Sequence, residues 1–531
     1  MYDLPQYGLA LPTSTLMSQG GDDRITIDER SGLNSYGCAP SPMASVMYSS
    51  STASSISSEA YRHVQAVHFR LRQQLKDDSA NAIYSGSLEQ ARVRIRAAYC
   101  LEEATDIVFA PSGTDLEYLA LAIAMQDDQP VCNLVVEVEE VGSGCQFSQA
   151  GQYFAPRTAM GKDVTKGKQL PGFAPERIKV CTLRMRSDMG PVQAMEAYEA
   201  ALSDAIADAL EQGERPLVHV IHRSKTGIIA PSLSSLDTLL ERFGERMDVV
   251  VDACQGRISP GAIDAYLKRN ATVFITGSKF FAGPPFSAFA LVPPGLAARM
   301  EGKKALPAGL ADFFARPEMP PHWQACDGGL PDTVNFGMLL RLEAALFEIE
   351  RFFGLPQGQA ELVIDAFNAA VTEIGDGLPF RLVDAATAGD LSGHEPSPLD
   401  RKMLHVVELT LAHSQTEKPL TFEQARTLYR LLYSDISDHF SEPEDILTAR
   451  EICHLGQPVR CIPGPDGAAA PTMRFALSAP LIAALAGRNA DVLAQRFESD
   501  FARVGRKIAL AATLLVSPEP AVPASKATDC G

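Results

Sequence analysis

The sequence has no CxxC pair and no apolar run that reaches the roughly 20 residues of a membrane-spanning helix. Its N-terminus lacks the basic start and apolar stretch of a signal peptide. The ten cysteines are scattered, which predicts reduced thiols, a cytoplasmic location and no metal site. Basic residues are outnumbered, 47 against 65 acidic ones, and the net charge of −18 disfavours nucleic acid as a partner.

What the chain does have is the mixture of a globular protein, with 46% hydrophobic and 21% charged residues, and at 531 residues it is too long for one core. Short β-branched runs alternate with helical patterns, which predicts an α/β fold: a mostly parallel sheet with helices on both faces. These runs are DIVFA (106–110), NLVVEV (133–138), IKVCTL (178–183), LVHVIH (217–222), DVVVDA (248–253) and ATVFIT (271–276). FSAFALV (286–292) follows a Gly-Pro turn and is expected to pair antiparallel in that sheet.

The pattern changes after Asn335, where separate strands and helices predict a smaller α+β domain. We predict four parts: an N-terminal wrapping segment rich in Ser, Gly and Pro (1–60), a large domain (61–335), a small C-terminal domain (336–515) and a disordered tail (516–531). In the small domain we expect strands at 380–383, 404–411 and 473–477, and helices at 336–353, 422–432 and 489–515. Two helices, 61–75 and 88–99, precede the first strand of the large domain.

Ligands in an open α/β sheet bind beyond the carboxyl ends of its strands, so the residues that follow each strand matter most. After DIVFA the chain turns through Ser112, Gly113 and Thr114 into a helix. Hydroxyls, a glycine that allows close approach and the unpaired amides of a helix N-terminus together suit a phosphate group. An ordinary capped turn is the alternative interpretation.

Asp252 ends the apolar run DVVVD. A carboxylate there is costly to bury unless it meets a cation or a donor, and a protonated pyridine nitrogen would satisfy it. The alternative is a cap for the following turn or helix.

Lys279 lies in the turn after ATVFIT, among Phe280, Phe281 and Phe286. A lysine in a turn is ordinarily a solvated charge. Held among aromatic rings, its ammonium would be desolvated and its pKa lowered, which is what an amine that forms a Schiff base needs.

Taken together, these three segments resemble those of the fold-type-I pyridoxal-phosphate enzymes, the aspartate-aminotransferase fold, and within them the class V aminotransferase group with its cysteine desulfurases and kynureninases. The resemblance covers about residues 32 to 515. It implies that pyridoxal 5'-phosphate forms a Schiff base with Lys279 and that Asp252 pairs with its ring nitrogen. It also implies that the phosphate lies in a cradle made by Ser112, Gly113, Thr114, Thr276 and Ser278. Members usually have histidine before this lysine, whereas this chain has Ser278.

The same resemblance assigns further roles. His222 or Thr226, in HVIHRSKTGIIAP, is a candidate for the cofactor's 3-hydroxyl, with a turn residue of no special role as the alternative. Thr333 is expected to reach the phosphate of a partner subunit, which implies a homodimer. Arg474, in TMRFALSAP, is expected to bind the substrate carboxylate through its guanidinium fork, and a surface salt bridge is the alternative. The residue stacked on the ring is left open between Val141, a small residue of the loop EEVGSGCQF, Phe147 and a residue from elsewhere.

We therefore predict an aminotransferase that acts on a small carboxylate-bearing amino acid. A lyase or cysteine desulfurase is the main alternative, because Cys453 and Cys461 lie upstream of Arg474, roughly where some desulfurases carry a catalytic thiol. A binding protein without cofactor is a further alternative, disfavoured by the cost of burying Lys279 and Asp252 with nothing between them. A nicotinamide enzyme lacks support, since VGSGC is too short for a GxGxxG turn.

Overall fold

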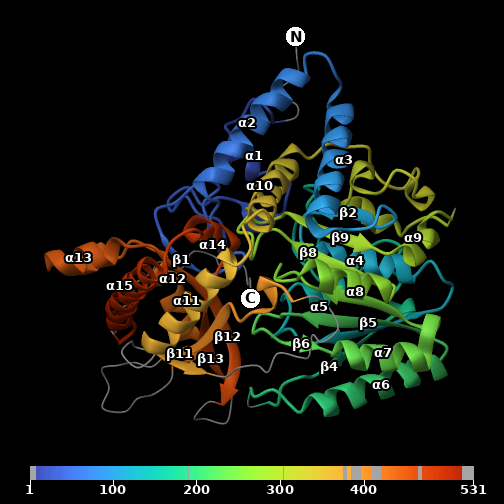
Figure 1. Cartoon of the computed structure of the whole chain (residues 1–531). Coiled ribbons are helices and arrows are strands. Elements are labelled where there is room, and N and C mark those ends of the chain that lie inside the picture. The colour runs from blue at the N-terminus through green and yellow to red at the C-terminus, as the bar shows by residue number, and fades with distance from the viewer. Residues whose placement is uncertain are drawn as a thin grey trace.

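The computed structural model describes residues 8–188, 190–302, 304–374, 380–383, 396–409, 420–463 and 469–516. Its strands form two sheets, and Figure 1 shows the larger one on the right and the smaller one on the left. The larger sheet has the order β2-β9-β8-β7-β5-β3-β4, with β6 paired to β5. Its strands are β2 (Asp106–Ala110), β3 (Val131–Val136), β4 (Ile178–Leu183), β5 (Arg215–His222), β6 (Ile229–Ala230), β7 (Asp248–Asp252), β8 (Ala271–Thr276) and β9 (Ala288–Val292).

The path β8-β7-β5-β3-β4 is parallel throughout, and β9 runs antiparallel between β2 and β8. The predicted α/β fold class and the antiparallel strand are therefore confirmed. β9 begins two residues later than the run FSAFALV because Phe286 has a φ of 75°, which an extended strand does not accommodate.

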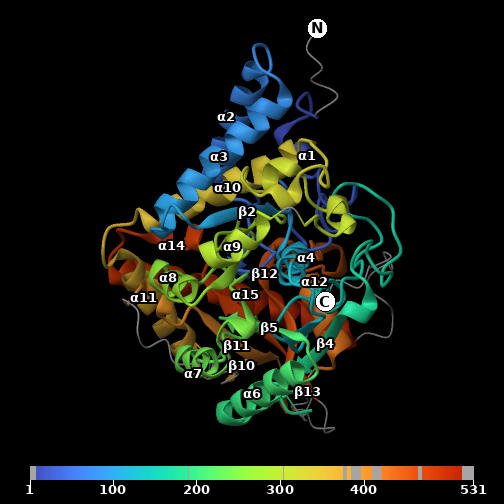
Figure 2. The same ribbon diagram turned by 90° about the vertical axis from the view of Figure 1, so that its right-hand side faces the viewer.

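Helices cover both faces of this sheet. One core unites α4 (Gly113–Ala124) and α9 (Pro294–Met300) with one face, and a second core includes α6 (Met195–Glu211), α7 (Leu233–Phe243) and α8 (Pro260–Lys268). Figure 2 shows α6 and α7 together at the lower edge. Strands buried on both faces explain why their sequences are almost continuously apolar.

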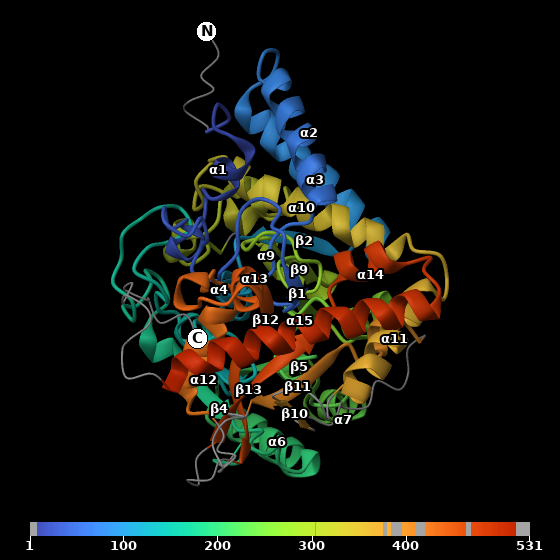
Figure 3. The ribbon, with the colours of Figure 1, turned by 90° about the vertical axis from the view of Figure 1, so that its left-hand side faces the viewer.

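The smaller sheet has the order β1-β12-β13-β11-β10. Its strands are β1 (Val46–Tyr48), β10 (Phe380–Val383), β11 (Leu404–Leu409), β12 (Cys453–Pro463) and β13 (Ala469–Ala476), and only β1 is parallel to its neighbour. The long helix α15 (Ala490–Val516) crosses this sheet against α11 (Gln359–Ile374), α12 (Phe422–Leu432) and α13 (Pro443–Arg450), as Figure 3 shows. The N-terminal segment thus supplies a strand to the sheet built mainly from the C-terminal part.

Three helices stand at the top of Figure 1: α2 (Ser58–Gln74), α3 (Ala80–Tyr99) and α10 (Phe336–Phe353), with α10 packed against both of the others. Serine side chains cap α2 and α3: Ser57 accepts a hydrogen bond from the Ala60 amide, and Ser79 from the Ala82 amide. The cap at Ser79 starts α3 eight residues before the predicted helix, because the first turns of α3 contain small and polar residues that weaken the apolar period.

The remaining helical turns are short: α1 (Thr13–Met17), α5 (Cys145–Ser148), α14 (Ala479–Leu485) and eight 3-10 turns. No helix in the described ranges is long and apolar enough to span a bilayer. Residues 410–411 of one predicted strand, and residues 517–531 of the predicted tail, lie outside the described residues. The predicted domain limits at residues 60, 335 and 515 stay predictions.

Candidate active site

Asp252 occupies the carboxyl end of β7, the strand between β8 and β5 in the larger sheet, where the next residues turn away from the sheet. Its Oδ1 accepts a hydrogen bond from the Cys254 amide at 2.9 Å. This bond is the turn cap that the alternative interpretation expects, and it engages only one carboxylate oxygen. The negative charge of Asp252 raises the pKa of the Cys145 and Cys254 thiols, after the larger effect of burial.

Two buried polar side chains lie near Asp252 on the same side of the sheet. His219 of β5 and Glu117 of α4 face each other, with 3.6 Å between His219 Nδ1 and Glu117 Oε2. Burial lowers the pKa of His219 to about 4, and the charge of Asp252 opposes that shift. Burial and then Asp252 raise the pKa of Glu117. Burial therefore favours the neutral forms of both His219 and Glu117.

Lys279 lies in the loop that joins β8 to β9. The loop is held by hydrogen bonds from the Gly277 amide to Ser287 O at 2.8 Å and from the Phe280 amide to Gln255 O at 3.2 Å. Its neighbours Phe280 and Phe281 are completely buried, whereas Lys279 itself is half-buried. Within the described residues the Lys279 ammonium makes no hydrogen bond or ion pair, so its nitrogen is available for another partner.

The start of α4 forms a set of anion donors. The amides of Asp115 and Leu116 bond back to Ser112 O, which leaves the amides of Gly113 and Thr114 with no backbone acceptor in the described part of the chain. A Cβ on Gly113 would lie 2.5 Å from Cys254 Sγ and 3.4 Å from Thr276 Cγ2. The glycine therefore permits α4 to approach the turn after β7 and the end of β8 closely.

The close packing of α4 on the turn after β7 and the end of β8 brings the predicted site segments together. Gly113, Cys254 and Thr276 come from the three segments predicted to carry the chemistry, and they are in contact. Thr276 Oγ1 also donates to Cys254 O at 2.7 Å, which ties the end of β8 to the Asp252 turn. Burial, followed by the charge of Asp252, raises the pKa of the Cys254 thiol, and the charge of Lys279 opposes that shift. The structure thus brings the lysine, the carboxylate and the anion donors together at one sheet edge.

This donor set fits pyridoxal phosphate. Free amides and a helix N-terminus suit the phosphate. Thr276 and Ser278, just before Lys279, are buried, and the Cys254 amide engages only Oδ1 of Asp252. One carboxylate crowds the cradle: Ser112 Oγ donates to Asp115, whose pKa is raised to about 7, mainly by burial. Loss of that negative charge would favour a phosphate beside it.

Arg24 also lies at this cradle, and the sequence analysis missed it. Its Nη2 lies 3.4 Å from Ser112 Oγ, while Asp22 pairs with the same guanidinium at 2.7 Å. The guanidinium also stacks on the rings of Phe154 and Phe286, at 4.8 and 4.7 Å from their centres. Nothing local in the N-terminal segment signals this position, because 88 residues separate Arg24 from Ser112.

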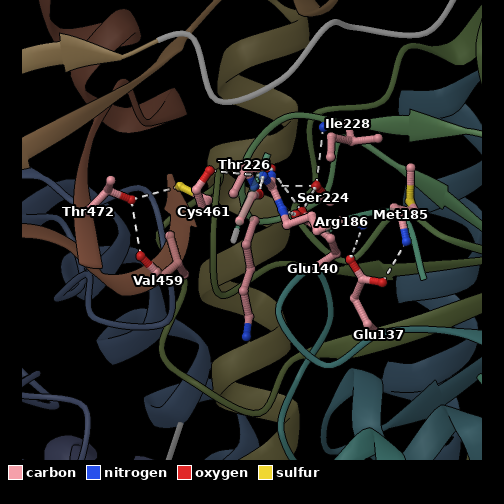
Figure 4. Close-up of polar contacts among 12 residues, drawn as sticks. Glu137, Glu140, Met185, Arg186, Ser224, Thr226, Ile228, Val459, Cys461 and Thr472 are labelled. Carbon is pink, nitrogen blue, oxygen red and sulfur yellow. Dashed lines mark hydrogen bonds and ion pairs between the residues drawn. The ribbon is translucent and has the colours of Figure 1, made fainter. Parts of the chain in front are cut away.

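The residues proposed for the 3-hydroxyl have different surroundings. Side chains alternate along a strand, and Asp252 pairs with Ile221, so His222 faces the opposite side of the sheet. There His222 Nδ1 lies 3.2 Å from Tyr266 OH of α8, and the structure does not bring it to the other site residues. Thr226 Oγ1 donates to Glu140 at 2.8 Å and accepts from Arg186 at 2.8 Å, in the network drawn in Figure 4.

The loop after β3 was predicted to contain the ring-stacking residue. Val141 is buried, and the Lys166 ammonium covers the Phe147 ring at 4.9 Å. Burial, followed by the charges of Glu117 and Asp252, raises the pKa of the Cys145 thiol in this loop, and the charge of Lys279 opposes that shift. Cys145 is therefore a second residue near the site that sequence reasoning missed, since a lone cysteine after Gly144 has no motif.

Arg474 lies in β13 of the smaller sheet and is 4% exposed, so it is not a surface salt bridge. Its Nη1 donates to Lys225 O at 2.9 Å and its Nη2 to Gln457 O at 3.0 Å. Lys225 directly precedes Thr226, and burial, followed by the charges of Arg474 and Lys279, lowers the pKa of its ammonium to about 8. The charges of Arg474 and Lys279 thus both act on the Lys225 side chain. Thr333, in contrast, is exposed and forms no part of this group.

The two cysteines considered for a desulfurase are buried in β12. Burial raises the pKa of Cys453 to about 12 and also raises that of Cys461. Cys461 Sγ lies 2.9 Å from Thr472 Oγ1 within the sheet. A nucleophilic thiol needs a lowered pKa and access to substrate, and neither cysteine has these properties.

No protein-family model and no curated protein sequence matches the chain. Solved structures similar to it include cysteine desulfurase CsdA from Escherichia coli, at 16% identity, a TM-score of 0.48 and coverage of 89% of this chain and 96% of that one. Pyridoxamine-pyruvate aminotransferase from Mesorhizobium loti has 14% identity, a TM-score of 0.45 and coverage of 90% and 97%. TDC from Oryza sativa, solved with PLP and tryptamine, has 11% identity, a TM-score of 0.48 and coverage of 85% and 81%.

Proposed function

We propose that the protein is a fold-type-I enzyme dependent on pyridoxal 5'-phosphate and that it acts on the amino group of a carboxylate-bearing amino acid. The contact of Gly113 with Cys254 and Thr276 is the observation that supports this most strongly. It supports a cofactor site because Lys279, Asp252 and the free amides of α4 belong to the three segments that meet at this contact. When bound, the cofactor supplies an electron sink for charge that develops at the α-carbon of the substrate.

Each side chain then has a role that its surroundings support. Lys279 would hold the cofactor and would act on the proton of the substrate α-carbon. Asp252 would pair with the protonated ring nitrogen. Ser112, Gly113 and Thr114, with Ser278, hold the phosphate. Arg474 orients the substrate carboxylate.

For the reaction we propose transamination, with loss of carbon dioxide or of a β-substituent as the rival outcomes. The buried Cys453 and Cys461 disfavour a desulfurase that uses either thiol. We also propose a homodimer in which the exposed Thr333 reaches the phosphate of the partner subunit. A cytoplasmic location agrees with the free state of the nine cysteines in the described ranges.

The first prediction concerns Lys279. Protein purified with pyridoxal phosphate should show a visible absorption band, and Lys279→Ala should lack it because no amine remains to form the covalent link. Reduction with borohydride and peptide mass spectrometry should place the cofactor on Lys279. A visible band that persists in Lys279→Ala, or a label on another lysine, would contradict the assignment.

The same preparation can decide the reaction. Amino acids are added one at a time, and release of a keto acid, carbon dioxide or sulfide is measured. Keto-acid formation that requires an amino acceptor supports transamination. Release of carbon dioxide would instead indicate a decarboxylase, and release of sulfide a desulfurase. Cys453→Ser and Cys461→Ser should leave every rate unchanged.

A further inference from the structure

Four basic side chains gather beside the Lys279 loop, and we call them the basic cluster: Arg223, Lys225, Arg257 and Arg474. Arg223 and Lys225 follow β5, Arg257 follows β7, and Arg474 lies in β13. Arg474 donates to the carbonyl of Lys225 at 2.9 Å. The Arg257 guanidinium lies 5.8 Å from the ring centre of Phe280, the residue after Lys279. The cluster therefore lies between the two sheets and next to the reactive lysine.

The three arginines are buried without a counter-charge. Arg223 is 8% exposed, and Arg257 and Arg474 are each 4% exposed. The Nε of each is buried with no hydrogen-bond partner among the described residues. Their Nη atoms donate to neutral oxygens: Arg223 to Asp400 O, Arg257 to Ser50 O and Oγ, and Arg474 to Lys225 O and Gln457 O. No carboxylate in the described ranges forms an ion pair with any of the three.

The positive charges of the basic cluster repel one another, and this repulsion lowers the pKa of two of its members. Burial, followed by the charges of Arg474 and Arg223, lowers the pKa of Arg257 to about 9. Burial, followed by the charges of Arg474 and Lys279, lowers the pKa of Lys225 to about 8.

Two carboxylates oppose this repulsion only in part. Glu140 is paired with Arg186 at 2.5 Å. Burial lowers the pKa of Arg223 and the charge of Asp400 opposes that shift, but the atom that Asp400 presents to the guanidinium is its carbonyl oxygen. Cations left unpaired in a buried place cost folding free energy, so a bound anion would be strongly favoured there.

We propose that the basic cluster binds a second acidic group of the substrate, so that the substrate is a dicarboxylic amino acid. Its α-carboxylate lies on Arg474, and its side-chain carboxylate lies on Arg257 and Arg223. One guanidinium fork accommodates one carboxylate, and the two further arginines would have no role with a substrate that carries a single acid group. This inference rests on the proposed function, because that function places the amino acid beside Lys279.

The test uses succinate and glutarate as dicarboxylate probes and butyrate as the matched monocarboxylate. Isothermal titration calorimetry measures their binding to the full chain loaded with pyridoxal phosphate. Either dicarboxylate should bind about tenfold or more tightly than butyrate, since charge-assisted hydrogen bonds from arginine are worth at least that factor. Arg257→Met should lose this preference and leave butyrate affinity unchanged. Arg506→Met, which removes an exposed arginine of α15, is the matched control and should bind all three like the unaltered protein.

Thermal melting provides an independent measurement. Without probe, Arg257→Met should melt at a higher temperature than the unaltered protein, because an uncompensated buried charge has been removed. Succinate should raise the melting temperature of the unaltered protein and not that of Arg257→Met. Arg223→Met serves as the second variant if Arg257→Met does not fold, with the same expectations.

Equal binding of dicarboxylates and butyrate, or a preference that survives in both arginine variants, would overturn the inference. The visible absorption band separates this failure from failure of the proposed function. A band without dicarboxylate preference leaves the cofactor assignment in place and removes the second acid group. A preference without a band shows an anion site that serves a different reaction.

Discussion

At the scale of single residues, the distance between α4 and the Asp252 turn depends on one missing methyl group. A Cβ on Gly113 would lie 2.5 Å from Cys254 Sγ, and the sulfur has little room to move because Cys254 is buried. The backbone of Gly113 has an ordinary φ, so close packing and not backbone conformation demands glycine here.

Gly113→Ala should therefore weaken cofactor binding by about tenfold or more, because the helix must retreat from the turn and its amides would point at a displaced phosphate. Titration of the apo protein with pyridoxal phosphate, followed at the visible band, measures the loss. Gly86→Ala is the control, since a Cβ at this position of α3 meets nothing within 4 Å. That change should leave cofactor affinity unaltered and stabilise α3 by up to about 1 kcal/mol. Equal cofactor affinity in the two variants would contradict the close approach.

At the scale of elements, one buried ion pair and its hydrogen bonds connect four strands. Arg186, after β4, pairs with Glu140, after β3, and donates to Thr226 beyond β5 and to Cys461 O of β12 at 3.2 Å. Figure 4 shows these side chains meeting between the two sheets. The pair is 3% and 0% exposed, so each charge depends on the other.

We expect Arg186→Met to lower stability by about 3 to 5 kcal/mol, because Glu140 keeps its buried charge and loses its cation. The midpoint of urea denaturation measures this. The double variant Arg186→Met with Glu140→Leu should recover most of the loss, since it removes both charges together. A double variant as unstable as the single one would show that packing, not the charge left on Glu140, causes the loss.

At the scale of the whole molecule, buried neutral histidines make the fold sensitive to acid. His454 of β12 is completely buried, stacks on Tyr433 with 5.8 Å between ring centres, and has neither ring nitrogen hydrogen-bonded within the described residues. Burial lowers its pKa to about 4. The unfolded chain takes up this proton near pH 6.5 and the folded chain only near pH 4, so stability is lost as the pH falls through that window.

His454→Phe keeps a ring on Tyr433 and removes the titrating group. Its stability should therefore fall less between pH 6.5 and 4, by up to about 3 kcal/mol, than that of the unaltered protein. Melting temperatures across this range measure the difference. His439→Asn alters an exposed histidine and should leave the pH dependence unchanged. If His454→Phe and the unaltered protein lose stability in parallel, His454 does not contribute to acid sensitivity.

The sequence predicted the larger sheet well because each of its strands is a local apolar run, and it predicted the three segments that meet because each follows such a run. It missed Arg24, Arg257 and Lys225. Each of these side chains reaches the site through contacts between segments far apart in the chain, and a single charged residue in a turn has the same local pattern whether it is solvated or buried. The prediction for His222 failed for a related reason. Side chains alternate along β5, so the face that His222 occupies depends on the register of β5 with β7, which the sequence does not show.

The loop that holds Lys279 connects β8 directly to β9, its neighbour in the sheet. Both ends of this connection are therefore clamped by one antiparallel ladder, and the α-carbon of the lysine has almost no freedom to travel. Whatever reach the amine needs during a turnover must come from rotation about its own methylene bonds.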